Sequence, residues 1–193
     1  MLFRSIPSDG LPYRVQIAEF SSTANTELVT VAELKPCAIT KVTLVNEGPF
    51  PILAGPVELI REHGLIGRTP VLFVAPGERF ELGFGPDAAL RVRRKVAEVE
   101  PDQTPLSRFV AKEHNITLFL CNIGDETKQL QLTERIPVSE VEQVVVEFDA
   151  SESTSGANPD ENGFITWDLE LPPGGRETVR LRYTVKKRKN VDL

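Results

Sequence analysis

The chain is poor in the residue types that most often carry catalysis, metal binding or disulfide bonds. Its 193 residues include two histidines, two cysteines and one tryptophan. Two cysteines cannot build the disulfide framework that stabilises many small secreted domains. Both lie in apolar runs, PCAIT and LFLCN. We therefore expect Cys37 and Cys121 to be buried thiols, and the sequence leaves a single bridge between them open.

Long apolar runs are also absent. Nothing in the sequence approaches the roughly 18 consecutive apolar residues of a membrane-spanning helix. The first ten residues, MLFRSIPSDG, lack the apolar stretch of a signal peptide. The sequence therefore predicts no membrane span and favours a cytoplasmic location, with the open alternative that the chain is a fragment of a longer protein.

Basic residues are fewer than acidic ones, 22 against 28, which gives a formal net charge of −6 at pH 7. A negative chain disfavours general attraction to nucleic acid or anionic membranes, although a local basic patch remains compatible with it. A solvated strand face and a frayed terminus are the alternative explanations for the two basic stretches. The candidate contacts to an anionic partner in these stretches are Arg91, Arg93, Arg94, Lys95, Lys186, Lys187, Arg188 and Lys189.

Apolar and polar residues alternate along much of the chain, as in half-buried strands. In ITWDLEL this places Ile165, Trp167 and Leu169 on one face, so Trp167 is expected in the core rather than on a sugar-binding surface. No segment keeps a helical period over three turns, and 15 prolines and 13 glycines interrupt the chain. We predict an all-β fold. The expected strands cover residues 13–20, 27–34, 39–46, 56–61, 80–84, 90–99, 114–122, 128–136, 141–148, 165–171 and 178–185.

The stretch FVAPGERFELGFGPD, residues 73–87, raises the choice between a glycine-rich ligand loop and a bend between strands. A dinucleotide fingerprint needs a different glycine spacing and a following helix. Proline and then glycine at the centre of a turn fit type II geometry, so Pro76-Gly77 is expected to join two antiparallel strands. Pro173-Gly174 repeats this order. The glycines are therefore expected to serve the backbone.

The two halves of the chain share a pattern. TPVLFVAPGERFELGF aligns without gaps on TWDLELPPGGRETVRL, and VTLVNEG resembles LFLCNIG, which aligns Asn46 with Asn122. We predict an internal duplication that forms two antiparallel β-sandwich units, immunoglobulin-like in general form. The units are expected at residues 1–99 and 107–193, with a linker at 100–106.

Candidate catalytic and metal-binding residues are scattered. Neither His63 nor His114 has a nucleophile motif nearby, so both are expected to be ordinary surface residues. Cys37, Cys121, His63 and His114 are suitable zinc ligands, but they do not form the close pairs of structural zinc sites. EVEPD and NPDEN lack calcium-loop spacing. The sequence therefore predicts no cofactor and no metal.

Several stretches occur together in an order that resembles a known family. They are PSDGLPYRV, VNEGPFPILAGPVELI, GLIGRTPVLFVAPGERFELGFGPD, RVRRKV, RIPVSE and NGFITWDLELPPGGRETVRLRYTV. Together they resemble the C-terminal domain of mucoidy-inhibitor-A-like proteins, domain of unknown function 4139, over residues 7–185. The resemblance implies a β-rich region that follows another β domain and a coiled coil. It implies no activity and no catalytic residues, and the basic ending KKRKN departs from the family pattern.

These observations favour a non-catalytic interaction or scaffolding module that presents sheet edges and loops to an unknown protein partner. Nucleic acid is not an expected partner, and the sequence does not predict an oligomeric state. Two alternatives remain open. One is a carbohydrate-binding or envelope-associated module; the other is a hydrolase that uses His63 or His114.

Overall fold

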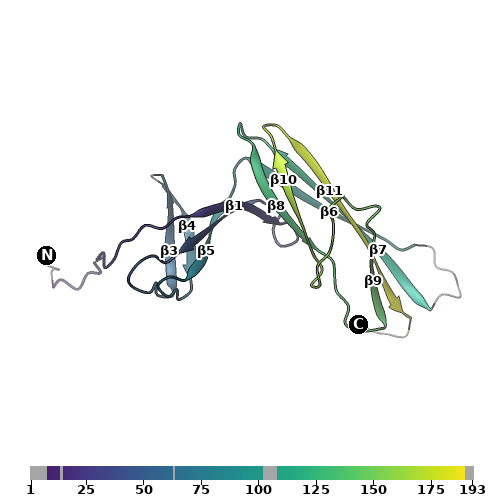
Figure 1. Cartoon of the computed structure of the whole chain (residues 1–193), viewed down its shortest axis with the longest axis horizontal. Helices are drawn as coiled ribbons and strands as arrows, with labels where there is room; N and C mark the ends of the chain where they lie inside the picture. The colour runs from purple at the N-terminus through teal and green to yellow at the C-terminus, as the bar shows by residue number, and fades with distance from the viewer. Residues whose placement is uncertain (1–7, 14, 63, 102–107, 190–193) are drawn as a thin grey trace.

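The computed structural model describes residues 8–13, 15–62, 64–101 and 108–189. Within these ranges the chain forms β-strands and no helix, which confirms the predicted all-β fold (Figure 1). No helix that could span a membrane is therefore found in the described ranges. The strands are β1 (Asn25–Val31), β2 (Ile39–Val45), β3 (Gly55–Arg61), β4 (Gly64–Val71), β5 (Arg79–Pro86), β6 (Leu90–Val99), β7 (Phe109–Asn122), β8 (Lys128–Arg135), β9 (Val144–Phe148), β10 (Phe164–Leu171) and β11 (Arg176–Arg188).

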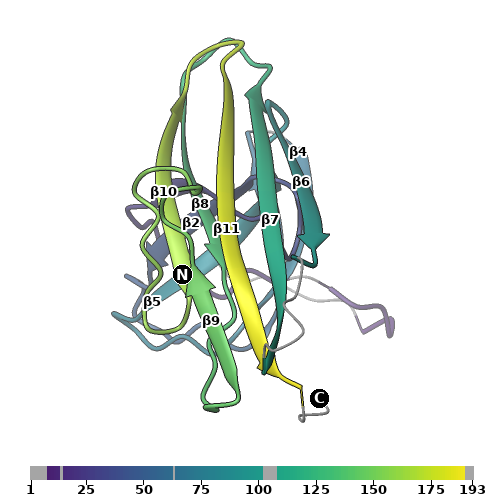
Figure 2. The same ribbon diagram turned by 90° about the vertical axis from the view of Figure 1, so that its right-hand side faces the viewer.

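The described strands form three sheets. One sheet has the order β10-β8-β1-β2-β5, the second has the order β6-β7-β11-β9, and β3 and β4 form a separate hairpin. The long strands β7 and β11 lie side by side at the centre of the second sheet (Figure 2). Neighbouring strands are antiparallel except for β1 and β8, which are parallel over residues 28–31 and 130–133. This parallel pair joins the first part of the chain to the second.

The main core lies between the four-stranded sheet and the β10-β8-β1 part of the five-stranded sheet. It contains Leu118 and Leu120 from β7 and Leu130 and Leu132 from β8, all buried. Trp167 of β10 is 5% exposed, which confirms its predicted place in the core. Burying one leucine side chain of this kind contributes about 1.5–3 kcal/mol to folding. The alternating pattern of the strands therefore produces the core that the sequence predicted.

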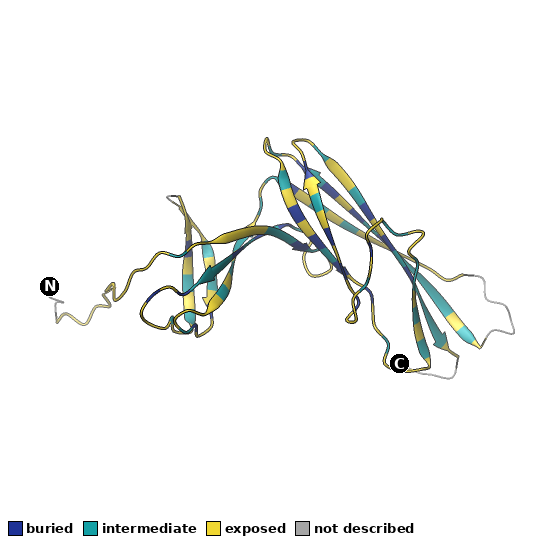
Figure 3. Ribbon diagram, viewed as in Figure 1, coloured by how far each residue is buried: buried dark blue, intermediate teal, exposed yellow. Residues whose placement is uncertain are grey.

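The strands near the N-terminus bury fewer apolar residues. Strands β2, β3 and β4 and the segment after β4 contribute the buried side chains Val42, Leu59, Val71 and Val74, none of which belongs to the main core cluster. The difference is visible as more exposed segments in the β3-β4 region (Figure 3). We call β1 to β5 the first group of strands and β6 to β11 the second group. The first group therefore has a smaller core of its own than the second.

Several local predictions differ from the structure. The described part of residues 13–20 is not a strand, although its residues alternate. Strand β4 was missed because Gly64, Gly67 and Pro70 interrupt its pattern. Cys37 and Cys121 are half-buried rather than buried, and both are free thiols. Alternation alone predicted the first segment wrongly because a strand also needs a neighbour.

The predicted turns are confirmed. Gly77 has a φ of 79° and Gly174 a φ of 69°, the left-handed values that type II turns require at their third position. The backbone N–H of Glu78 donates to Ala75 O, and that of Gly175 donates to Pro172 O, which closes each four-residue turn. These turns lead into β5 and β11.

The segment at 100–106, predicted to be a linker, follows β6 and precedes β7. Strands β6 and β7 are antiparallel neighbours over ten positions, from the pair Leu90 and Asn122 to the pair Val99 and Glu113. Strand β6, which the sequence assigns to the first unit, is therefore hydrogen-bonded to β7 of the second unit. Residues 102–107 lie outside the described residues, and the division into two folding units stays a prediction.

The Thr30 side chain offers a test of the core. Its hydroxyl is buried without a hydrogen-bond partner in the described residues, and the residue is 1% exposed. Burying an unpaired hydroxyl costs free energy. We expect Thr30→Val to raise the free energy of unfolding by about 1 kcal/mol, measured by urea unfolding. A loss of stability would show that the hydroxyl has a favourable contact.

Candidate functional site: a basic face on the four-stranded sheet

The outer face of the β6-β7-β11 sheet collects basic side chains at one end. Pairing aligns Arg91 of β6 with Cys121 of β7 and Arg176 of β11. Two residues further along β6, Arg93 pairs with Phe119 of β7. Two residues beyond that, Lys95 of β6 and Arg180 of β11 both pair with the same residue of β7, Thr117. Side chains two residues apart lie on the same face of a strand. We call this surface the basic face; it consists of Arg91, Arg93, Lys95, Arg176 and Arg180 around Phe119.

Phe119 lies at the centre of the basic face and is 43% exposed. A hollow of about 310 Å³ lies against this ring, and its lining includes Arg91, Arg93 and Arg176 together with one acidic residue, Glu177. An aromatic ring beside guanidinium groups is typical of surfaces that contact other proteins.

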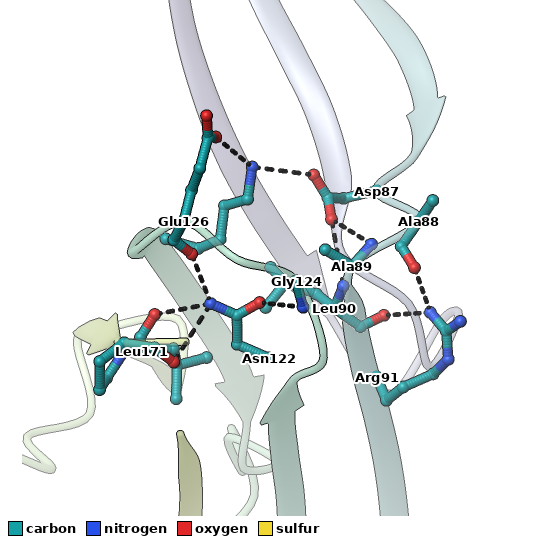
Figure 4. Close-up of polar contacts among 11 residues, drawn as sticks. Asp87, Ala88, Ala89, Leu90, Arg91, Asn122, Gly124, Glu126 and Leu171 are labelled. Atoms are coloured by element: carbon teal, nitrogen blue, oxygen red, sulfur yellow. Dashed lines mark hydrogen bonds and ion pairs between the residues drawn. The ribbon is translucent and has the colours of Figure 1, made fainter. Parts of the chain in front are cut away.

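Most side chains of the basic face form no ion pair with a described residue. Within the described ranges, no carboxylate forms an ion pair with Arg93, Lys95, Arg176 or Arg180. The Arg91 guanidinium donates to the backbone oxygens of Ala88 and Leu90 at 2.7 and 3.2 Å (Figure 4). The whole chain has a net charge of −6. The basic face is therefore a local positive surface on a chain that is negative as a whole.

Arg94 does not belong to the basic face. It points to the inner side of β6, where its Nε and a terminal nitrogen donate to the two carboxylate oxygens of Glu134 at 2.9 and 3.1 Å. The Glu134 side chain is 0% exposed. This buried pair connects β6 of one sheet to β8 of the other. Alternation in RVRRK already separates Arg94 from Arg91, Arg93 and Lys95.

The second basic stretch lies at the far end of the same sheet. Lys95 pairs with Thr117 and Lys187 with Val110, so they are seven positions apart along β7, roughly 23 Å at the usual rise per residue. Lys186 forms an ion pair with Glu147 at 2.5 Å, whereas the Arg188 guanidinium lies 5.8 Å from the centre of the Phe109 ring. Lys189 is exposed. The structure therefore does not bring this stretch together with the basic face.

A charge-balanced band borders the basic face. Arg182 of β11 forms ion pairs with Glu113, Asp149 and Glu152. Hydrogen bonds from Asn115 and from Arg182 hold the pKa of Glu113 below its ordinary value. The hydroxyl of Ser151, followed by backbone amides and the Arg182 charge, lowers the pKa of Asp149. These carboxylates limit the positive surface to the end of the sheet near Arg91.

His114 is largely covered, unlike the surface residue that the sequence predicted. Its ring stacks on Tyr183 with 4.8 Å between ring centres, and its Nδ1 lies 3.6 Å from a Glu98 carboxylate oxygen. Burial raises the pKa of Tyr183. His63 lies outside the described residues. The described part of the chain contains no group of three or more His, Cys, Asp or Glu side chains suited to a metal ion.

Asn122 fixes the end of β7 next to this face (Figure 4). Its fully buried side-chain nitrogen donates to the backbone oxygens of Glu126, Leu171 and Pro172 at 2.7, 2.9 and 3.2 Å, and its oxygen accepts from the Gly124 N–H at 3.0 Å. A Cβ at Gly124 would lie 2.8 Å from that of Ala89, so only glycine fits this approach. Asn122 thereby joins β7, the following loop and the end of β10.

Asn46 makes the corresponding contacts after β2. It donates to Phe50 O at 3.0 Å and to Val74 O at 3.2 Å, and it accepts from the Gly48 N–H at 3.2 Å. Position 122 follows position 46 by 76 residues, and Leu171 follows Val74 by 97. The same two shifts relate the aligned stretches of sequence: 76 residues for VTLVNEG and LFLCNIG, and 97 residues for the stretches that contain the two Pro-Gly turns.

The described residues thus define an all-β domain with an exposed basic sheet face. The model of the family described as Domain of unknown function (DUF4139) matches residues 3–187, and the chain belongs to this family. Protein F37C4.5 of Caenorhabditis elegans is 20% identical over 185 residues, which cover 90% of this chain and 33% of that protein. The chain therefore spans about a third of the length of this curated relative. No solved structure matches the chain.

Proposed function

We propose that this domain is a non-catalytic interaction module whose basic face binds an acidic segment of a protein partner. The observation that carries the proposal is the gathering of Arg93, Lys95, Arg176 and Arg180, without ion-pair partners among the described residues, around the exposed ring of Phe119. Exposed charges of one sign speed association with a complementary partner and exclude partners of like charge.

The extent of the basic face favours a short acidic segment over a nucleic acid. Arg91 to Lys95 covers five residues of a strand, or roughly 16 Å. Beyond it lie the carboxylates of Glu113, Asp149 and Glu152. A longer polyanion that follows the strands would meet these negative charges, whereas a segment with a few acidic side chains would not.

We also infer that the two groups of strands are immunoglobulin-like sandwich units that arose by duplication. The matching bonds of Asn46 and Asn122 support this inference. The strand register supports it as well. Val45 pairs with Arg79 in the first group, and Cys121 pairs with Arg176 in the second; the sequence alignment matches position 45 with 121 and position 79 with 176. A closer relationship with mucoidy-inhibitor-A-like proteins stays a prediction.

Charge reversal tests the proposed function. We expect the chain to bind a fluorescein-labelled glutamate-rich peptide, with an affinity that falls as salt is added. Arg93→Glu and Arg176→Glu should each weaken binding on the order of tenfold in fluorescence anisotropy, because each replaces an attraction by a repulsion.

Arg79→Glu is the matched control. Arg79 is exposed, begins β5 after the Pro76-Gly77 turn, and so stands where Arg176 stands after the Pro173-Gly174 turn. It lies outside the basic face, and its reversal should change binding little. Equal losses from Arg79→Glu and Arg176→Glu, no peptide binding, or tighter binding to single-stranded DNA would each contradict the proposal.

A further inference from the structure

Strand β6 is an open sheet edge beside the basic face. It pairs with β7 on one side, and no described strand pairs with its other side. An edge strand presents unpaired N–H and C=O groups that can receive a further strand. Val96 and Val99 of β6 are 44% and 48% exposed. The edge therefore combines backbone groups that pair with no described strand with apolar side chains suited to β pairing.

The chain itself shows how such an edge is filled. Asn25 of β1 pairs with Thr43 of β2, and Arg93 of β6 pairs with Phe119 of β7. Position 119 follows position 43 by 76 residues, the same shift that relates Asn46 to Asn122. Strand β1 therefore occupies in the first group the place that β6 occupies in the second.

The edge of β1 that corresponds to the open edge of β6 is already occupied. There β8 adds as a parallel neighbour at residues 28–31. The corresponding residues of β6 are 96–99. The same backbone arrangement thus accepts a parallel strand in one half of the molecule and has no such neighbour among the described residues in the other.

Charge decides which strand the open edge accepts. Basic side chains on an edge discourage pairing with neutral or basic strands. On β6, Arg91, Arg93 and Lys95 are basic and lie on the outer face, whereas Glu98 on the inner face forms an ion pair with Lys112 at 2.5 Å. A strand with acidic residues beside positions 91–95 and β-branched residues beside 96–99 complements this edge.

We infer that an extended acidic segment of the partner adds to β6 as a parallel strand, with its acidic residues first and its β-branched residues after them. This inference rests on the proposed function, because it specifies how the partner of the basic face is bound. The backbone of β6 supplies hydrogen bonds, and the basic face selects the charge of the incoming strand.

N-methylated peptides test this mode of binding. The probe is a labelled peptide in which glutamates alternate with valines and are followed by valine and isoleucine. Methylating the amides that would face β6 should weaken binding about tenfold, since two lost hydrogen bonds contribute roughly 1.5 kcal/mol. Methylating the alternate amides should have little effect. Amides of residues 96–99 should exchange more slowly with deuterium in the complex.

The outcomes separate this inference from the proposed function. A peptide of reversed sequence should bind more weakly, because its acidic end would lie beside residues 96–99. If Arg93→Glu abolishes binding but both methylated peptides bind equally and β6 shows no added protection, the inference is overturned and the proposed function stands. If neither the unmethylated probe nor the glutamate-rich peptide binds the wild-type chain, both the inference and the proposed function are overturned.

Discussion

Arg94→Met is expected to lower the free energy of unfolding by about 3–5 kcal/mol, because it leaves the buried carboxylate of Glu134 without its partner. The carboxylate is 0% exposed and accepts two hydrogen bonds from the guanidinium. Ile165 lies beside it on β10, so an unpaired charge would face an apolar neighbour rather than water. Equilibrium unfolding in urea measures the loss.

The double replacement Arg94→Met with Glu134→Leu is the control. It removes both charges and fills the space with apolar atoms, and such replacements are often neutral or stabilising. We therefore expect it to recover most of the stability lost in Arg94→Met. A loss below about 1 kcal/mol in the single variant would show that the pair acts like an exposed one. Exposed Lys95→Met provides the comparison on the other face of β6.

Asn122→Ala should cost about 3 kcal/mol, the second largest effect. The replacement leaves the oxygens of Glu126, Leu171 and Pro172 without their donor, and an unsatisfied buried group costs about 1–3 kcal/mol. Asn122→Asp should cost at least as much, because the carboxylate has the same shape but cannot donate to these oxygens. Urea unfolding with a near-ultraviolet circular dichroism signal reports both losses.

Asn46→Ala and Asn25→Ala calibrate this result. Asn46 has two backbone acceptors and lies in the group of strands with the smaller core, so its replacement should cost less than that of Asn122. Asn25 is exposed and bonds to Glu27, and its replacement should stay within about 0.5 kcal/mol. If Asn122→Ala resembled Asn25→Ala, the bonds at the end of β7 would have no part in stability.

The candidate site was only partly predictable from the sequence. Arg91, Arg93 and Lys95 were selected because they are close in the chain, and they do share a face. Arg94 was included for the same reason but lies inside, paired with Glu134. Arg176 and Arg180 were missed as site residues, because only the pairing of β11 with β7 brings them beside Phe119. The alternation in RETVRLRY was the one signal that pointed Arg180 outward.

Side-chain period and local backbone geometry can be read from the sequence alone, and they predicted the strands with clear alternation, the inward side of Trp167 and the two Pro-Gly turns. Which strands are neighbours emerged only in the folded chain, including the parallel pair of β1 with β8 and the open edge of β6. Alternation gives each strand two faces, but it contains no information on register between distant strands. That register comes from packing the whole core at once, and it also determines which charges meet on the surface.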